Sequence, residues 1–130
     1  MPGFPVFASR RVRRTPFTER VEAAGLSGYT VYNHMLLATS FASLEDDYAH
    51  LKEYVQIWDV SVERQVEVSG PDAHALATLM SARDLRAAVP GKCYYAPLTD
   101  ANGGMLNDPI ALCLAADRFW FSIADSDVLY

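Results

Sequence analysis

The chain has 130 residues, of which 51% are hydrophobic and 21% are charged, and its formal net charge is −5. This length suits one domain with a modest core, and this composition predicts a globular rather than a disordered protein. A general nucleic-acid binder needs a broad basic face, which a net acidic chain does not favour. No apolar run approaches the ~20 residues that span a bilayer. We therefore expect no nucleic-acid partner and no membrane partner.

The N-terminus and the cysteines bear on the compartment. Residues 1–7 are apolar but are interrupted by two prolines and a glycine, so they lack the hydrophobic region of a signal peptide. Cys93 and Cys113 cannot form a disulfide framework, and each lies in a strand-like run. We expect both to be buried free thiols. These features predict a cytoplasmic protein.

The expected division of the chain is an N-terminal arm at 1–28 and a partial lobe at 29–130. The arm is rich in proline and carries the arginines Arg10, Arg11, Arg13 and Arg14. These side chains either bind a carboxylate or phosphate group or remain solvated. At the other end, residues 125–127 resemble the N-cap of a helix, with three residues after them. A domain rarely ends one turn into a helix, so we expect a fragment of a longer protein.

The region from 29 to 60 predicts a strand, a helix and a buried segment. Residues 29–32 are β-branched or aromatic and predict a strand, whereas 36–41 remain unassigned. A helix is expected over 44–56, with Ser43 as its N-cap. Its apolar stripe consists of Leu44, Tyr48, Leu51 and Val55. Residues 57–60 are expected to be buried.

The acidic residues at the start of this helix raise the question of a metal site. Asp46 and Asp47 lie in the expected first turn, and His50 follows one turn later. Acids in the first turn are already explained by the helix macrodipole. We therefore expect no metal in this protein.

A second strand and helix follow. A half-exposed strand is predicted over 62–68, where Val62, Arg64, Val66 and Val68 alternate with Glu63, Gln65 and Glu67, with Arg64 as the one charged exception on the apolar side. Pro71 suits the first position of a helix, in which His74 would lie on the exposed face. The apolar face of that helix would consist of Ala73, Leu76, Leu79 and Met80.

The last third of the chain predicts strands near 93–98, 105–115 and 118–124, with turns at 100–103 and 117–118. Pro109 cannot donate to a ladder, so the middle strand is expected to be an edge strand or to be bulged there. A bulge would change the direction of the Asp108 carboxylate. The order of elements predicts an α+β fold with helices packed on an antiparallel-rich sheet.

The glycine turn before Asp108 gives the first candidate site. Residues 93–97 would form the other arm of one hairpin, so that Tyr94, Tyr95 and Asp108 face one another across the turn, with Ser122 on the next strand. Such a group suits a flat hydrogen-bonding ligand or an onium cation. The alternative is a turn carboxylate that backbone N–H groups satisfy. No phosphate loop, nucleophile elbow or zinc signature is found, so hydrolysis and phosphoryl transfer lack support.

Several motifs in order resemble the glycine-cleavage T-protein (aminomethyltransferase) family. They are the Tyr-Ala-Pro of 95–97, the Gly-Gly-Met-Leu-Asn-Asp of 103–108, the run over 55–61 that ends in Asp-Val-Ser, and Val-Ser-Gly-Pro-Asp-Ala at 68–73. The resemblance covers roughly residues 29–124. It implies the N-terminal lobe of a three-lobed, tetrahydrofolate-binding protein.

Within that family the chain is most similar to the dimethylsulfoniopropionate demethylases, on residues 9–11, 29–37, 63–67 and 122–127. Typical T-proteins carry a second aspartate where Asn107 stands and an aliphatic residue where Pro109 stands, which weighs against aminomethyl transfer. The resemblance therefore implies methyl transfer from a sulfonium, or another small-molecule donor, to folate N5.

The same resemblance implies roles for three residues. Asp108 would be the catalytic residue and would hold the folate, Tyr95 would contact the pterin or the substrate, and Ser122 would add a hydrogen bond. Two alternatives stay open: an aminomethyltransferase of the glycine cleavage system, or a non-catalytic folate-binding relative. A homodimer also stays open.

Overall fold

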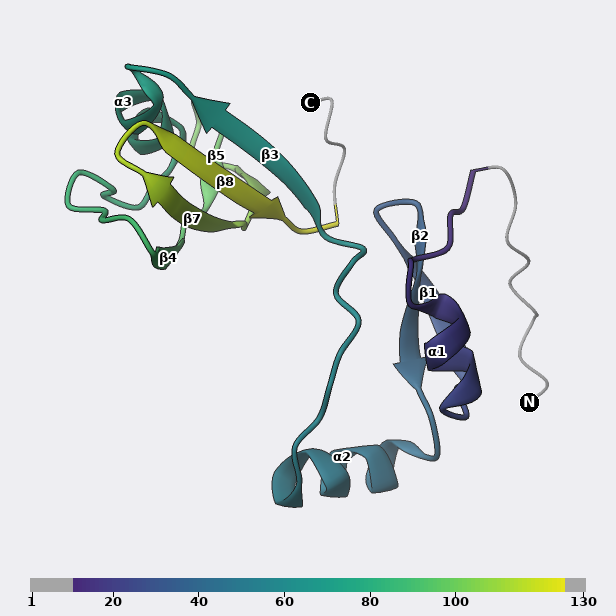
Figure 1. Cartoon of the computed structure of the whole chain (residues 1–130). Coiled ribbons are helices and arrows are strands. Elements are labelled where there is room, and N and C mark those ends of the chain that lie inside the picture. The colour runs from purple at the N-terminus through teal and green to yellow at the C-terminus, as the bar shows by residue number, and fades with distance from the viewer. Residues whose placement is uncertain (1–10, 126–130) are drawn as a thin grey trace. The chain divides into compact units, whose positions relative to one another are not determined.

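The computed structural model describes residues 11–125, which fall into two compact units that divide between Val62 and Glu63. Helices and antiparallel strands occur in both units, as Figure 1 shows, so the predicted α+β class is confirmed. The Asp125–Asp127 helix start that the sequence predicts falls largely outside the described residues, as does Arg10. Within residues 11–125, no helix is long and apolar enough to cross a membrane.

The first unit contains α1 (Thr18–Ala23), a hairpin of β1 (Gly28–Tyr32) and β2 (Met35–Ser40), and α2 (Leu44–Glu53). The strand predicted over 29–32 is confirmed, and the unassigned stretch that follows forms β2. Asn33 and His34 make the turn with positive φ, a conformation that asparagine tolerates. The buried Asn33 amide donates a hydrogen bond of 3.1 Å to the carbonyl of Val62. This bond joins the hairpin to the end of the unit.

The described part of the expected N-terminal arm contains ordered structure. Besides α1, the Arg13 backbone pairs with β2, since its N–H donates to His34 O at 2.7 Å and its carbonyl accepts from Leu36 N at 2.9 Å. The Arg14 guanidinium lies 2.6 Å from a Glu22 carboxylate oxygen. Both side chains are half-exposed, so this ion pair contributes little stability. Arg14 is thus engaged within its own unit.

Helix α2 begins where the sequence predicts and ends three residues earlier. Ser43 Oγ accepts from the amide of Asp46 at 3.0 Å, which confirms the N-cap. The Asp47 carboxylate accepts from the amides of Phe41 and Ala42, at 3.0 and 3.3 Å. No residue of α2 is buried, and its apolar stripe is exposed, with Leu44 at 80%.

The prediction of a buried segment at 57–60 is wrong. Ile57 is 98% exposed, and Trp58 and Val60 are also exposed. Apolar character predicts burial only where another element covers the side chain, and within the first unit these side chains remain open.

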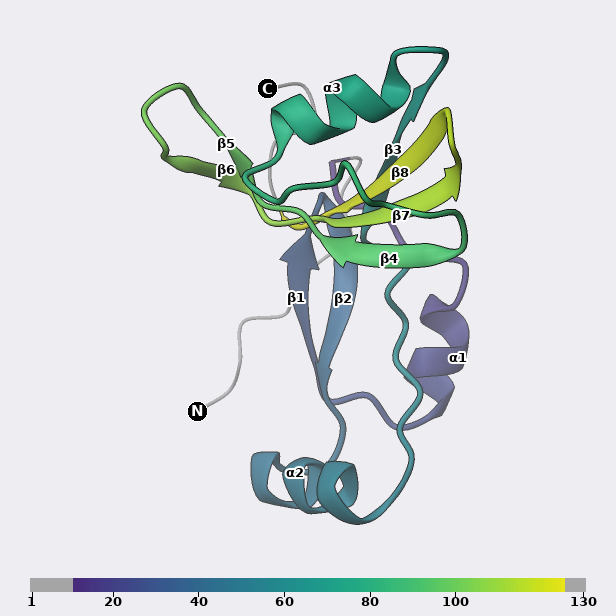
Figure 2. The ribbon, with the colours of Figure 1, turned by 90° about the vertical axis from the view of Figure 1, so that its left-hand side faces the viewer.

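The second unit is a four-stranded antiparallel sheet with α3 (Ala73–Met80) on one face, as Figure 2 shows. The strand order is β3 (Arg64–Ser69), β8 (Arg118–Ile123), β7 (Ile110–Ala115) and β4 (Lys92–Tyr95). A separate ribbon pairs β5 (Leu98–Thr99) with β6 (Met105–Asn107). The core between α3 and the sheet includes Ala73, Ala77, Leu85, Ala111, Cys113, Phe119, Phe121 and Ile123.

Two predictions about the second helix are corrected. The helix begins at Ala73 with Asp72 as N-cap, so Pro71 precedes it instead of occupying its first position. His74 is not exposed: its Nε2 lies 2.7 Å from Leu85 O, and its ring centroid lies 5.3 Å from that of Phe119. The ring packs toward the sheet, so His74 has a structural role.

The two cysteines lie on opposite faces of the sheet. Cys113 is buried, as predicted, and burial raises the pKa of its thiol. Cys93 is exposed, which corrects the prediction. Lys92 is the register partner of Cys113, and Cys93 follows it, so alternation along β4 turns Cys93 to the opposite face.

Candidate functional site

The single hairpin predicted around the glycine turn is two separate pairings. The strand predicted over 93–98 divides into β4 and β5, and the strand predicted over 105–115 divides into β6 and β7. Strand β4 pairs with β7 in the main sheet, and β5 pairs with β6 in the ribbon. Asp108 and Pro109 are the junction between β6 and β7. The chain leaves the ladder there because proline has no N–H to donate.

Pro109 is therefore neither in an edge strand nor in a bulged one. Strand β7 lies inside the sheet, between β8 and β4, and it begins after the proline at Ile110. The irregular registers of the second unit lie elsewhere, between Leu98 and Thr99 and between Cys113 and Ala115. Asp108 therefore lies between two strands and not within one.

The backbone on both sides of Asp108 is anchored. Pro109 is fully buried, and its carbonyl accepts from Ala96 N at 3.0 Å. On the other side, the Asn107 side chain donates from Nδ2 to Ala124 O at 3.3 Å and accepts from Ala124 N at Oδ1, at 3.0 Å. The Asp108 side chain itself is exposed, and within residues 11–125 its carboxylate makes no hydrogen bond. An anchored backbone thus carries an available carboxylate.

Tyr95 and Ser122 lie in one cross-strand row. Both are register partners of Ile110, Tyr95 from β4 and Ser122 from β8. Directly opposed residues share a face, and strands lie about 4.8 Å apart, which separates Tyr95 and Ser122 by roughly 10 Å. The row lies on the face opposite α3, where Tyr95 is 50% exposed. Asp108 precedes Ile110 by two residues.

The second tyrosine of the prediction does not join this row. Tyr94 lies on the other face, packed against the core, and its hydroxyl accepts from Val89 N at 3.0 Å. Successive side chains of a strand alternate between the two faces, so adjacent tyrosines cannot both face Asp108. Only Tyr95 remains a candidate.

Two polar residues that sequence reasoning missed complete the surroundings of Ser122. The Ser122 hydroxyl donates to Glu63 Oε2 at 2.7 Å and accepts from Gln65 Nε2 at 2.8 Å. Gln65 is also the register partner of Ser122. The alternation of valines with polar residues on 62–68 was the available signal for Gln65. Nothing local in the sequence indicated that Glu63 would meet Ser122.

The next row of the same face carries a charged cluster. Glu67 accepts from the Arg118 guanidinium, at 3.0 and 2.8 Å, and from the Trp120 indole. These hydrogen bonds, that from Arg118 most of all, hold the pKa of Glu67 below its ordinary value. Nowhere in residues 11–125 do three His, Cys, Asp or Glu side chains come together as metal ligands.

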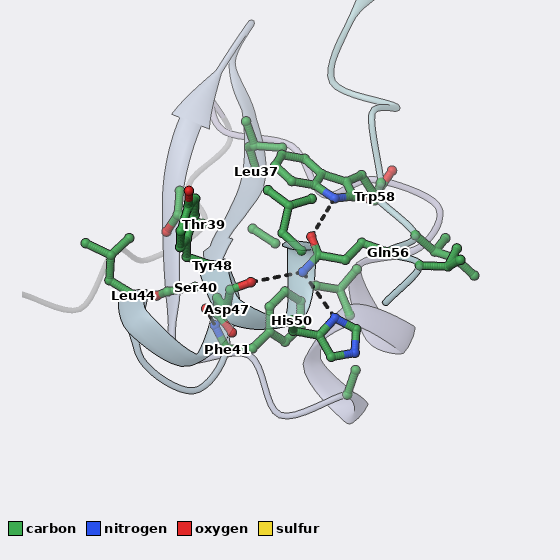
Figure 3. Close-up of a pocket in the computed structure, with 17 residues that line it drawn as sticks. Leu37, Thr39, Ser40, Phe41, Leu44, Asp47, Tyr48, His50, Gln56 and Trp58 are labelled. Atoms are coloured by element: carbon green, nitrogen blue, oxygen red, sulfur yellow. Dashed lines mark hydrogen bonds between the residues drawn. The ribbon is translucent and has the colours of Figure 1, made fainter. Parts of the chain in front are cut away.

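A cavity of about 800 Å³ lies in the first unit, between β2, α2 and the segment after α2 (Figure 3). Gln56 crosses it: its Nε2 donates to Asp47 O at 3.1 Å and lies 3.3 Å from His50 Nδ1, and its Oε1 accepts from Trp58 Nε1 at 3.0 Å. None of Tyr95, Asp108 and Ser122 lines this cavity.

The aspartate of the Asp-Val-Ser motif has a structural role in the first unit. Asp59 accepts from the amide of Ser61 at 3.0 Å and from the Thr15 hydroxyl. Partial burial alone would raise the pKa of Asp59, but these hydrogen bonds outweigh it and place that pKa below its ordinary value. The motif therefore connects Thr15 with the end of the first unit through a hydrogen bond.

Comparison with known proteins identifies the family. Residues 17–128 match the GCVT N-terminal domain. Dimethylsulfoniopropionate demethylase DmdA of Ruegeria pomeroyi is 61% identical over 124 residues, which are 95% of this chain and 34% of that protein. A probable aminomethyltransferase of Halobacterium salinarum is 32% identical over 106 residues, which are 82% of this chain and 29% of that protein.

The fold comparison agrees with the sequence comparison. The crystal structure of the glycine cleavage system aminomethyltransferase T from Bartonella henselae matches with a TM-score of 0.66 at 19% identity, over 88% of this chain and 32% of that one. The chain thus spans about a third of the length of the relatives that it matches. The match across residues 17–128 and the shared fold place this chain in the GCVT N-terminal domain family.

Proposed function

We propose that the full-length protein that carries this chain is a tetrahydrofolate-dependent methyltransferase that demethylates dimethylsulfoniopropionate. The observation that carries the proposal is the 61% identity to the Ruegeria pomeroyi demethylase. The Halobacterium aminomethyltransferase is 32% identical. Asn107 and Pro109, which depart from the pattern of typical T-proteins, favour the same reading.

Methyl transfer from a sulfonium requires the protein mainly to align the two reactants and to stabilise the charge. A sulfonium carries a neutral leaving group: as the methyl carbon is transferred, its C–S bond breaks and the electron pair stays on sulfur as a thioether. Bound tetrahydrofolate would supply the nucleophilic nitrogen N5, which accepts the methyl group and gives up its own proton to solvent. The protein contributes proximity and fixed electrostatics.

The described residues fit this task in their donor and acceptor chemistry. The exposed Asp108 carboxylate can accept from a ring N–H or an amine of the folate, and its negative charge favours a nearby cation. The half-exposed Tyr95 ring offers a face to a pterin or to a sulfonium. Ser122 already donates its hydrogen to Glu63, so toward a ligand it would accept.

The decisive experiment incubates the full-length protein with dimethylsulfoniopropionate and tetrahydrofolate and follows 5-methyltetrahydrofolate. Its formation supports the proposal. Activity that instead requires glycine and a lipoyl carrier protein favours an aminomethyltransferase, the second candidate, which the 32% relative supports. Folate binding without turnover of either donor indicates a non-catalytic relative.

The remaining parts of the proposal concern location and partners. We propose action in the cytoplasm on a small-molecule methyl donor, without nucleic acid or a membrane. A homodimer stays a prediction, which light scattering on the full-length protein tests.

A further inference from the structure

The side chain of Asn107 hydrogen-bonds to the backbone of another segment in the way that a neighbouring strand would. Its side-chain amide meets both the N–H and the carbonyl of one residue, Ala124, at 3.0 and 3.3 Å. Its own backbone belongs to β6, where it is the register partner of Leu98. One residue thereby ties the β5–β6 ribbon to the end of β8.

This pair of hydrogen bonds bears directly on Asp108. The Asp108 carboxylate makes no hydrogen bond within the described part of the chain, so its position depends on the backbone that carries it. The burial of Pro109 fixes that backbone on one side, and the Asn107 pair fixes it on the other. Ala124 also follows Ser122 by two residues, so the same pair sets Asp108 relative to the end of β8.

We propose that Asn107 is a positioning residue. Its two hydrogen bonds with Ala124 hold the Asp108 carboxylate in the orientation that methyl transfer requires. The inference rests on the proposed role of Asp108. It also gives a physical reason for an asparagine here, since an ionised aspartate would keep the acceptor but lose the donor. A carboxylate oxygen would then face the Ala124 carbonyl oxygen, so one of the two hydrogen bonds would be replaced by repulsion between two acceptors.

A double-mutant cycle in the full-length protein tests this, with Asn107→Ala and Asp108→Asn alone and together. We expect Asn107→Ala to lower kcat by roughly 10- to 100-fold, since a displacement of about 1 Å at a reacting group costs that much. In the Asp108→Asn background the same change should have almost no further effect. A role that is merely structural would lower kcat by the same factor in both backgrounds, and that result overturns the proposal.

Two further variants support the cycle. Asn107→Asp has the same shape and keeps the bond from the Ala124 amide, so it tests the lost donor even if Asn107→Ala folds poorly; we expect it also to lower kcat. Asn102→Ala removes an exposed amide from the β5–β6 turn and should leave kcat unchanged. A loss of activity in Asn102→Ala equal to that of Asn107→Ala contradicts the proposal.

Hydrogen exchange at the Ala124 amide separates this proposal from the proposed function. Asn107→Ala should speed that exchange, whether or not the protein demethylates its substrate, and unchanged exchange refutes the contact. If exchange accelerates but kcat stays at the parent value, the positioning role is refuted. If Asp108→Asn itself retains parent activity, the proposed function of Asp108 fails, and with it the catalytic part of this inference.

Discussion

Ser122 on β8 and Glu63, which precedes β3, are joined by a hydrogen bond of 2.7 Å in which the serine hydroxyl donates. Gln65 donates to the same hydroxyl at 2.8 Å. The serine hydroxyl therefore uses its one hydrogen as a donor and one lone pair as an acceptor. It links β8 to β3 and to the residue before β3, on the face of the sheet opposite α3. Its contribution to the fold can be measured apart from any ligand.

Ser122→Ala should lower the free energy of unfolding by about 1 kcal/mol, because two partly exposed hydrogen bonds are lost and water replaces some of each. Urea denaturation measures it. Glu63→Gln, which keeps an acceptor for the serine, is the matched control and should stay within about 0.5 kcal/mol of the parent. Equal losses in both variants would point to the charge of Glu63 rather than to the serine.

Asp108→Asn should lower kcat of the full-length protein about 100-fold, the size expected when one fixed electrostatic group is removed. Its thermal midpoint should barely move, because the carboxylate is exposed. Asp117→Asn removes the same charge from the exposed β7–β8 turn and should leave kcat unchanged. Near-normal turnover in Asp108→Asn would refute the assigned role.

The Glu67 carboxylate should make stability depend on pH in the acid range. Its pKa in the folded state is lowered by the hydrogen bonds from Arg118 and Trp120, so its contribution is complete above the ordinary value of 4.5. As pH falls below that value, through the lowered folded pKa, the contribution is lost. Urea denaturation of the parent and of Glu67→Gln should therefore differ at pH 7 and converge in acid. A difference that stays constant down to pH 3 would contradict this.

The 130-residue chain alone should bind tetrahydrofolate weakly or not at all. Ligands need concave sites that bury most of their surface, whereas Tyr95 is 50% exposed on an open sheet face and Asp108 is exposed as well. Isothermal titration calorimetry with tetrahydrofolate provides the measurement. A dissociation constant in the micromolar range for residues 1–130 would refute the prediction.

Exposure of the segment after α2 can be tested by substitution in the 130-residue chain. Ile57→Ser should change the free energy of unfolding by less than about 0.5 kcal/mol, since the side chain is 98% exposed. Leu36→Ala, at a residue that is 5% exposed, should cost about 2–5 kcal/mol and serves as the positive control. A comparable loss in Ile57→Ser would show that this side chain is covered after all.

Local signals in the sequence predicted local structure well. Ser43 with Asp46 marked the start of α2 because a cap depends on residues three positions apart. The β-branched and aromatic residues of 29–32 marked β1. Pro109 marked a disturbance of the ladder, since it lacks an N–H, but the disturbance is a break between β6 and β7 and not the predicted edge strand or bulge. The order of motifs along the chain also gave the family, and with it the fold class.

The candidate site could be predicted only in part. Asp108, Tyr95 and Ser122 were named from the sequence, and the sheet places Tyr95 and Ser122 in one row beside Ile110. The sequence could not separate Tyr94 from Tyr95, because which of two neighbours faces the core depends on strand register.

Three features were decided only by tertiary structure. The apolar side chains of residues 57–60 are exposed, because burial requires a covering element, which the local sequence does not specify. The contacts of Glu63 with Ser122 and of Asn107 with Ala124 join residues 59 and 17 positions apart. The sequence by itself determined which groups were present and that Asp108 follows a glycine turn. Only the folded chain decided that the backbone of Asp108 is anchored on both sides while its carboxylate remains available, because that arrangement depends on how separate strands align.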